Sequence, residues 1–198
     1  MKKSWVGNSN SIFKAHGATN HSKGEREKND YYATDPIASK FLLELESDLS
    51  NILEPACGEG HLSKEFINHG KKVYGCDLVD RGFGVQYNFF DIEKWDGDIV
   101  TNPPYKYAKE FVEHALDIVD EKRKVCMFLK LTFMESKKRK QLFINHPPKT
   151  IYVSSSRIAC AKNGDFNEIK KNGGIAVAYA WYVWEKGYKG DTKVKWFN

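Results

Sequence analysis

The sequence predicts an α/β protein whose doubly wound, mostly parallel sheet has seven strands. Short apolar runs of strand character alternate with segments of helical periodicity from residue 36 onwards. The first of these runs leads directly into a glycine turn and then a helix. Such alternation is typical of a parallel sheet covered by helices on both faces. With 198 residues, 41% of them hydrophobic, the chain is long enough to bury one substantial core.

The first 30 residues lack any such pattern. They are mostly polar, and residues 20–30 are polar or charged throughout. A segment of this composition cannot bury enough apolar surface to offset the entropy of ordering. We therefore expect residues 1–30 to be a disordered, flexible N-terminal arm and residues 31–198 to form a single domain.

The helices and strands follow in a regular order. The first helix is expected after Pro36, with Thr34 or Asp35 as its N-cap. Further helices are expected at 61–69, 107–119 and 135–145, and strands at 51–54, 72–76, 85–89, 98–101, 125–131, 151–154 and 175–184. Residues 155–174 have neither pattern, so they are expected to form an irregular insertion between the last two strands.

Composition excludes several classes of protein. No apolar run approaches the 18 residues of a membrane helix, and the N-terminus lacks the apolar region of a secretion signal, so a cytoplasmic protein without membrane contact is expected. The four cysteines form no CxxC pair and have no histidine at ligand spacing, so neither a disulfide framework nor a metal site is expected. A net charge of +5 permits a nucleic-acid partner without indicating one by itself.

Residues 52–60, ILEPACGEG, combine a strand, a glycine turn and the start of a helix. Gly58 and Gly60 let the backbone approach a ligand closely, and the helix behind them presents free N–H groups. Asp77 ends the next strand, where doubly wound proteins place a carboxylate that binds ribose hydroxyls. The turn is shorter than the dinucleotide fingerprint, and Glu59 would repel a pyrophosphate.

The second motif is Asn102-Pro103-Pro104-Tyr105, directly after the strand at 98–101. The prolines fix the backbone and remove two N–H donors. Carbonyl groups and the Asn102 side chain are then expected at a strand end, where open α/β sheets bind their ligands. This group can accept hydrogen bonds from an amino group, and the Tyr105 ring can stack on a planar molecule.

With these motifs the chain resembles the S-adenosylmethionine-dependent amino-methyltransferases, and most closely the DNA adenine-N6 methyltransferases. Residues 102–105 match the family pattern [DNS]-P-P-[YFW], residues 54–60 match its glycine loop, and residues 32–36 match aromatic-x-Thr-x-Pro. The order of the motifs is similar to the gamma arrangement, and short chains of this kind are typical of phage and prophage members. The resemblance covers residues 31–186 and implies the Rossmann-like fold of class I methyltransferases.

The resemblance also implies the site. It implies S-adenosylmethionine as the cofactor, DNA as the partner and N6 of adenine as the acceptor. The expected cofactor-binding residues are Tyr32, Thr34, Pro36, Glu54, Ala56, Gly58, Gly60, Asp77 and Asp91. The expected catalytic residues are Asn102, Pro103, Pro104 and Tyr105. The Asn102 side-chain oxygen and the Pro103 carbonyl would accept the amino hydrogens of a flipped base that stacks on Tyr105.

The chain departs from the family in size, because it has no room for a separate target-recognition domain. The insertion at 155–174 and the N-terminal arm would have to do that work. Arg157 and Lys162 are expected to contact phosphates, and Phe166 is a candidate second stacking ring. Basic clusters at 122–124, 137–140 and 170–171 are either solvated faces or phosphate contacts. Trp181 and Trp184 are expected in the core rather than against a base.

Three alternatives remain open. The Asn-Pro-Pro-Tyr motif also serves glutamine-N5 protein methyltransferases, although those usually carry a helical domain before the core. An adenine-N6 methyltransferase acting on RNA would use the same chemistry. A non-catalytic partner subunit is the alternative from a different class, and the intact motif at residues 102–105 argues against it.

Overall fold

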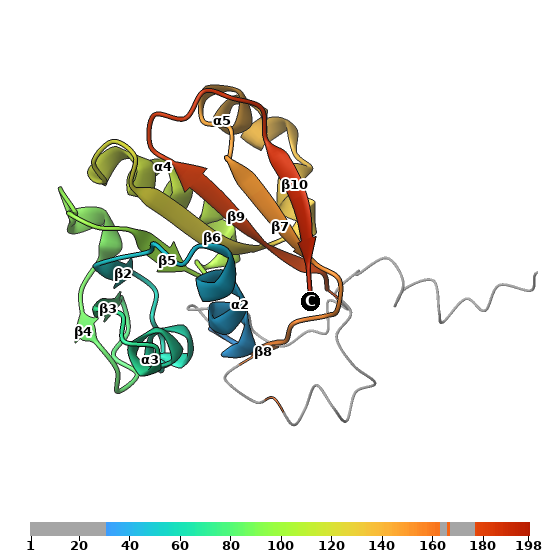
Figure 1. Ribbon diagram of the computed structural model, residues 1–198. Coiled ribbons are helices and arrows are strands. Elements are labelled where there is room, and N and C mark those ends of the chain that lie inside the picture. Colours follow the sequence, from blue (N-terminus) through green and yellow to red (C-terminus); the bar gives the residue numbers. More distant parts are fainter. Residues whose placement is uncertain (1–30, 163–165, 167–176) are drawn as a thin grey trace, which may run out of the picture.

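The computed structural model describes residues 31–162, 166 and 177–198, and it contains a twisted sheet of eight strands. The strand order is β10-β7-β9-β6-β5-β2-β3-β4 (Figure 1). Strand β9 runs antiparallel to its neighbours β6 and β7, and the other neighbouring strands pair in parallel. The bounds are β2 Ile52–Glu54, β3 Val73–Asp77, β4 Val85–Gln86, β5 Ile99–Thr101, β6 Lys124–Lys130, β7 Thr150–Ser154, β9 Tyr179–Glu185 and β10 Lys193–Phe197.

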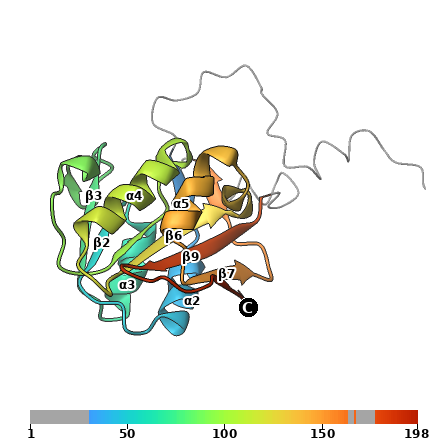
Figure 2. The same ribbon diagram turned by 90° about the horizontal axis from the view of Figure 1, so that it is seen from above.

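Helices cover both faces of this sheet. Figure 2 shows α4 (Ala108–Ile118) and α5 (Lys140–Asn145) on one side, with α2 (Ile37–Leu45) and α3 (His61–Asn68) on the other. Short 3-10 helices lie at Phe89–Asp91, Tyr105–Tyr107, Leu131–Met134 and Lys137–Arg139. Among these helices none is both long and apolar enough to cross a bilayer.

Strand β6 shows why the central strands are apolar without interruption. Val125, Met127 and Leu129 belong to the buried cluster beneath α4, whereas Cys126 and Phe128 belong to the cluster beneath α2 and α3. Alternate side chains of a strand point to opposite faces, so a strand covered on both faces needs apolar residues at every position. The doubly wound α/β fold predicted from the sequence is therefore confirmed.

Two further strands form a separate two-stranded ribbon, and neither was predicted from the sequence. Strand β1 (Tyr32–Thr34) pairs antiparallel with β8 (Cys160–Lys162), so that Thr34 lies opposite Cys160. Thr34 is thus in a strand rather than at a helix cap, and the insertion at 155–174 is not wholly irregular. Helix α2 begins at Ile37, whose N–H is bound by the Asp35 side chain at 3.0 Å.

Other boundaries also differ from expectation. The sheet has an eighth strand, β10, which was not predicted and which forms its edge beside β7. The single helix expected at 135–145 is instead a 3-10 turn at Lys137–Arg139 followed by the short helix α5. Only Val85–Gln86 of the strand expected at 85–89 pairs, because Asn88 caps a 3-10 helix that begins at Phe89. The expected arm at 1–30 and most of the insertion lie outside the described residues.

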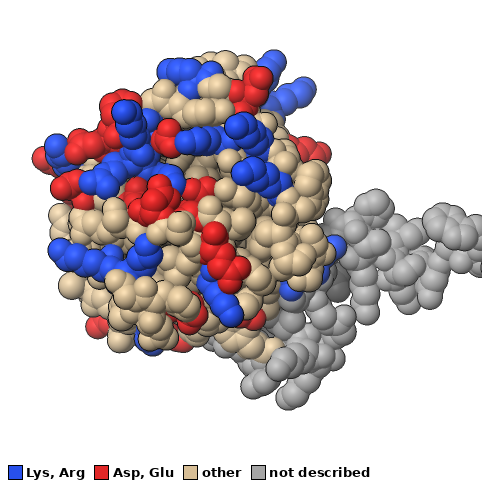
Figure 3. All heavy atoms as spheres, in the orientation of Figure 1, with Lys and Arg blue, Asp and Glu red and all other residues tan. Residues whose placement is uncertain are grey.

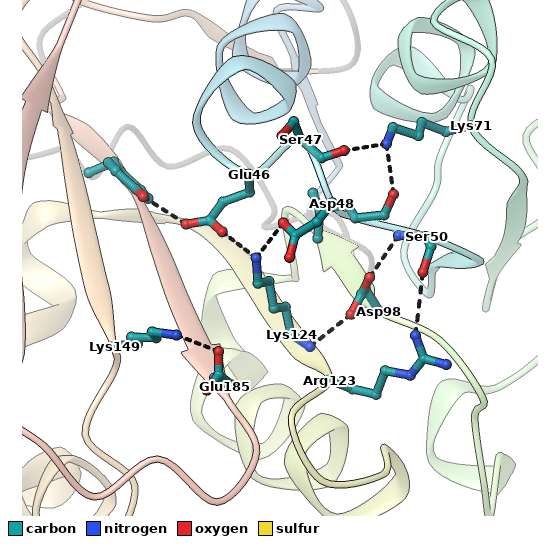
Figure 4. Close-up of polar contacts among 12 residues, drawn as sticks. Glu46, Ser47, Asp48, Ser50, Lys71, Asp98, Arg123, Lys124, Lys149 and Glu185 are labelled. Atoms are coloured by element: carbon teal, nitrogen blue, oxygen red, sulfur yellow. Dashed lines mark hydrogen bonds and ion pairs between the residues drawn. The ribbon is translucent and has the colours of Figure 1, made fainter.

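A polar network fastens the amino-terminal ends of the strands (Figure 4). The Lys124 ammonium bonds to Glu46 at 2.6 Å and to Asp48 at 2.5 Å. The Asp98 carboxylate accepts hydrogen bonds from the backbone N–H groups of Ser50 at 2.7 Å and Lys124 at 2.8 Å. These contacts join the α2–β2 connection to β5 and β6 at the end of the sheet opposite to the two sequence motifs.

Candidate functional site

The two motifs meet because β2 and β5 are neighbouring parallel strands whose carboxyl ends lie side by side. The glycine turn follows β2, and Asn102 follows β5. A pocket opens between them, with the β1 ribbon as its third wall. Its lining residues are Tyr31, Tyr32, Ala33, Thr34, Glu54, Ala56, Cys57, His61, Leu62 and Asn102. Within the described residues, no group of three His, Cys, Asp or Glu side chains could hold a metal ion.

The Asn102 side chain has a defined orientation. Its amide nitrogen, Nδ2, donates to Thr34 Oγ1 at 2.8 Å and to the Tyr32 carbonyl oxygen at 3.4 Å. A backbone carbonyl can only accept, so the NH2 group and not the oxygen must face Tyr32. The amide oxygen, Oδ1, is buried and has no hydrogen-bond partner in the described part of the chain. Asn102 thus lines the pocket and has one acceptor without a partner among the described residues, which is the kind of atom that an amino group would need.

The glycine turn is held by a carboxylate. Gly58 and Gly60 have φ values of 53° and 79°, in the left-handed region that favours glycine. Asp77 Oδ2 accepts the Gly58 N–H at 2.9 Å, and Asp77 Oδ1 accepts the Val79 N–H at 3.0 Å. Since each carboxylate oxygen has two lone pairs, Asp77 retains acceptor capacity beyond these bonds.

Two aromatic rings of the chain itself use the space that these glycines leave. A Cβ atom at Gly58 would lie 2.2 Å from Tyr31 Cε2, and one at Gly60 would lie 2.5 Å from Phe83 Cγ. The Tyr31 hydroxyl accepts the Glu59 N–H at 3.3 Å and lies 3.2 Å from His61 Nδ1. Sequence reasoning missed Tyr31, Phe83 and His61, and no motif or spacing in the chain could have indicated their contacts.

Glu54 is a buried acid that lines the pocket. Its carboxylate accepts a hydrogen bond from the Ser63 hydroxyl. Burial raises the pKa of Glu54 from 4.5 to about 8, against the opposing effect of the Ser63 bond, and the negative charge of Asp77 adds to the rise. The side chain is therefore largely protonated at neutral pH.

Tyr105 is packed by its own chain. Its hydroxyl donates to the Tyr179 hydroxyl at 3.0 Å, its ring centroid is 5.3 Å from that of Tyr32, and Lys130 Nζ is 4.5 Å from the ring centroid. Burial raises the pKa of the phenol well above its ordinary value. Pro103 is buried and Pro104 half-buried. The open face expected for base stacking is thus partly covered.

The remaining site residues predicted from the sequence are more scattered. Asp91 is exposed and Pro36 is the residue before α2, and neither lines the pocket. Arg157 is exposed beyond the carboxyl end of β7. The Lys162 backbone pairs with Tyr32, but its side chain lies outside the described part. The Phe166 ring lies 5.8 Å from the ring of His61, which lines the pocket.

The basic clusters separate into two kinds. Residues 122–124 lie at the amino end of β6, where Arg123 bonds to Asp96 at 2.7 Å and Lys124 joins the network of Figure 4. Arg139 donates to the carbonyl groups of Thr132, Phe133 and Glu135. These cations have structural partners, whereas Lys137 and Lys138 are exposed. Lys170 and Lys171 lie outside the described residues.

Trp181 and Trp184 are almost completely buried. Their expected place in the core is confirmed, and the alternative that they stack on a base is wrong.

Comparison with known proteins supports the fold at low sequence identity. No protein-family model matches the chain, and a search of curated proteins finds no relative. Among solved structures, a candidate RNA methyltransferase, PH1948 from Pyrococcus horikoshii, superposes with a TM-score of 0.58 at 14% identity, covering 88% of this chain and 98% of that one.

Two further structures have the same architecture. An S-adenosylmethionine-dependent O-methyltransferase from Thermotoga maritima gives a TM-score of 0.52 at 13% identity, with coverage of 79% and 67%. The type IIG restriction endonuclease BpuSI gives 0.58 at 14% identity, and the match spans 83% of this chain but 26% of that much longer one. The chain therefore has the Rossmann-like fold that solved class I methyltransferases share.

Proposed function

We propose that the chain transfers a methyl group from S-adenosylmethionine to an exocyclic amino group, and that this group is N6 of adenine in DNA. The observation that carries the proposal is the Oδ1 acceptor of Asn102, which has no partner among the described residues and belongs to a residue that lines the pocket at the carboxyl ends of β2 and β5. A buried acceptor without a partner is costly, so it points to a ligand that donates a hydrogen bond there.

The residues present fit the cofactor. The two Asp77 oxygens each hold one backbone N–H and can still accept from ribose hydroxyls. Glu54, Ala56 and Cys57 line the pocket, whereas the rings of Tyr31 and Phe83 lie beside Gly58 and Gly60. We assign cofactor binding to this group together with Tyr32, Gly58 and Gly60. Pro36 and Asp91 are assigned to it from the sequence motifs alone, because neither lines the pocket. When bound, S-adenosylmethionine supplies a methyl group that its positively charged sulfur already activates.

The residues of the chain act on the acceptor nitrogen. An aromatic amino group is a poor nucleophile because its lone pair is delocalised into the ring. Asn102 Oδ1 and the Pro103 carbonyl accept its two hydrogens, which favours a more tetrahedral nitrogen with an available lone pair. Positive charge develops on this nitrogen during transfer, so fixed acceptors stabilise the transition state. Holding the amino group in line with the methyl group lowers the barrier to transfer further.

An adenine in duplex DNA must leave the stack before its amino group can enter such a pocket. Tyr105 and Phe166 are the rings assigned to the flipped base, with Arg157 and Lys162 at the phosphates. Tyr105 would need to exchange part of its contact with Tyr32 or Lys130 for contact with the base. The fold is shared with enzymes whose names refer to RNA as well as to DNA restriction.

The experiment is methyl transfer from labelled S-adenosylmethionine to separate pools of DNA, RNA and protein, followed by identification of the modified nucleoside or residue. We expect N6-methyladenine in DNA, and its loss in Asn102→Ala with little change in cofactor affinity. Asn68→Ala, at the exposed end of α3, is the matched control and should retain activity. Label in RNA alone, or in a glutamine of a protein, would replace the DNA assignment. Full turnover by Asn102→Ala would overturn the mechanism.

A further inference from the structure

We propose that Thr34 is a positioning residue for methyl transfer, which it serves by holding the Asn102 amide in the orientation that the Tyr32 carbonyl selects. The inference rests on the proposed function for its catalytic meaning. It differs from the cofactor-binding role that the sequence motif assigns to Thr34, and it is carried by a contact between β1 and the end of β5.

The orientation matters because the two ends of an amide do opposite things. The oxygen accepts hydrogen bonds, and the NH2 group only donates them. If the Asn102 amide turned by 180°, its two N–H donors would meet the N–H donors of the substrate amino group. The site would then repel the group that it must hold, even though every residue of the motif was still present.

The Tyr32 carbonyl, which can only accept, selects the end of the amide that faces β1, and the Thr34 hydroxyl provides the shorter contact that holds the amide in that place. Thr34 Oγ1 lies 2.8 Å from Asn102 Nδ2, an ordinary hydrogen-bond length, whereas the Tyr32 carbonyl lies at the long distance of 3.4 Å. The Cys160 sulfur, 3.9 Å from Nδ2, is a weak third acceptor. All three acceptors surround the nitrogen, and this leaves Oδ1 as the atom without a partner.

The fold holds Thr34 firmly in this place. The side chain is 3% exposed, and its backbone pairs with Cys160 in the β1–β8 ribbon. This ribbon brings together three segments that are distant in the sequence, namely residues 32–34, 102 and 160–162. Asn102 is therefore oriented by residues outside its own motif.

The test compares Thr34→Val, which keeps the shape but removes the oxygen, with Thr34→Ser, which keeps the oxygen. We expect Thr34→Val to lower kcat by about threefold to tenfold, the equivalent of one ordinary hydrogen bond. The Kd for S-adenosylmethionine should change by less than about twofold, which is below the effect of losing such a bond. Thr34→Ser should restore kcat. The matched control is Thr101→Val, a buried site whose hydroxyl has no partner in the described chain, and its kcat should remain that of the wild type.

A second measurement does not depend on activity. The side-chain NH2 protons of Asn102, observed by NMR, should exchange slowly with water in the wild type and Thr34→Ser but faster in Thr34→Val. If the wild type methylates nothing while this difference persists, the proposed function fails and the positioning contact stands. The positioning role is overturned if Thr34→Val weakens cofactor binding with kcat intact, if Thr34→Ser is as impaired as Thr34→Val, or if neither kcat nor exchange changes.

Discussion

The Asp77 carboxylate accepts a hydrogen bond from the backbone N–H of Gly58, with 2.9 Å between Oδ2 and the nitrogen. Its other oxygen accepts the Val79 N–H at 3.0 Å. Asp77 therefore ties the end of β3 to the glycine turn that follows β2. The residue that is proposed to bind ribose also shapes the turn on which the cofactor would lie, so its two roles should be lost together.

Asp77→Ala should lower both the stability of the protein and its affinity for S-adenosylmethionine. The loss of hydrogen bonds to a charged group costs about 1.5–3 kcal/mol in free energy of unfolding, and the loss of ribose contacts costs about 1–3 kcal/mol in binding. Urea unfolding and calorimetry measure the two effects. Asp80→Ala removes a nearby carboxylate that accepts the Gly82 N–H and is the control. Unchanged cofactor affinity in Asp77→Ala would contradict the proposed site.

The sequence predicted those parts of the fold that depend on local patterns. The apolar run of β6 and the glycine turn at residues 58–60 carry their signals within a few positions, and parallel topology then brings the ends of β2 and β5 together. The contact between Asn102 and Thr34 was not predicted, because Thr34 was expected at a helix cap or against the cofactor. Which atom of the amide faces which neighbour could not be predicted, since it depends on distances of a few tenths of an ångström.

Long-range and edge features were beyond sequence reasoning. Strands β1 and β8 pair across 126 positions and are three residues each, too short for a period to be recognised. Strand β10 carries exposed lysines and Trp196, which is 69% exposed, so it lacks the apolar pattern of a buried strand. The rings of Tyr31 and Phe83 cover the glycines through tertiary contacts that no spacing encodes.

Glu54 predicts a specific dependence of stability on pH. Its pKa is about 8 in the folded protein and near 4.5 when exposed, so the folded state keeps a proton that the unfolded state releases. The contribution of Glu54 to the free energy of unfolding is complete below pH 4.5, and it falls by about 1.4 kcal/mol for each pH unit between 4.5 and 8. Because glutamine cannot ionise, the stability of Glu54→Gln should not show this decline with rising pH. Unfolding curves at several pH values measure the difference. Glu44→Gln, at an exposed site on α2, is the control. Parallel profiles for wild type and Glu54→Gln would contradict the prediction.

Thr101→Val should stabilise the protein by about 1 kcal/mol. Thr101 is completely buried, and its hydroxyl has no hydrogen-bond partner among the described residues. Valine has the same shape without the hydroxyl, so the cost of desolvating an unpaired polar group disappears. Thr34→Val, where the lost oxygen is bonded to Asn102, should instead be destabilising. Denaturant midpoints of the two variants therefore move in opposite directions, and a loss of stability in Thr101→Val would mean that its hydroxyl has a partner.

Charge on the surface bears on the proposed DNA contact. Basic and acidic side chains are interspersed on the face drawn in Figure 3, in keeping with a net charge of only +5. The exposed residues Lys137, Lys138 and Arg157 follow β6 and β7 at the carboxyl ends of these strands, the end where Asn102 follows β5. A modest number of phosphate contacts at that end is therefore expected, rather than a strongly basic channel.

Binding to DNA should accordingly be salt-sensitive but weak, with log K falling against log salt at a slope of about −3 to −5. Arg157→Ala should reduce the magnitude of this slope by about 1 without changing which base is methylated, because phosphate contacts position the nucleic acid and base contacts specify it. The control is Lys94→Ala, which removes an exposed cation paired with Asp120 near the amino end of β6. Filter binding at several salt concentrations measures the slopes. If Lys94→Ala reduced the slope as much as Arg157→Ala, the contribution would be general charge rather than a contact beside the pocket, and a salt-independent affinity would remove the nucleic-acid assignment.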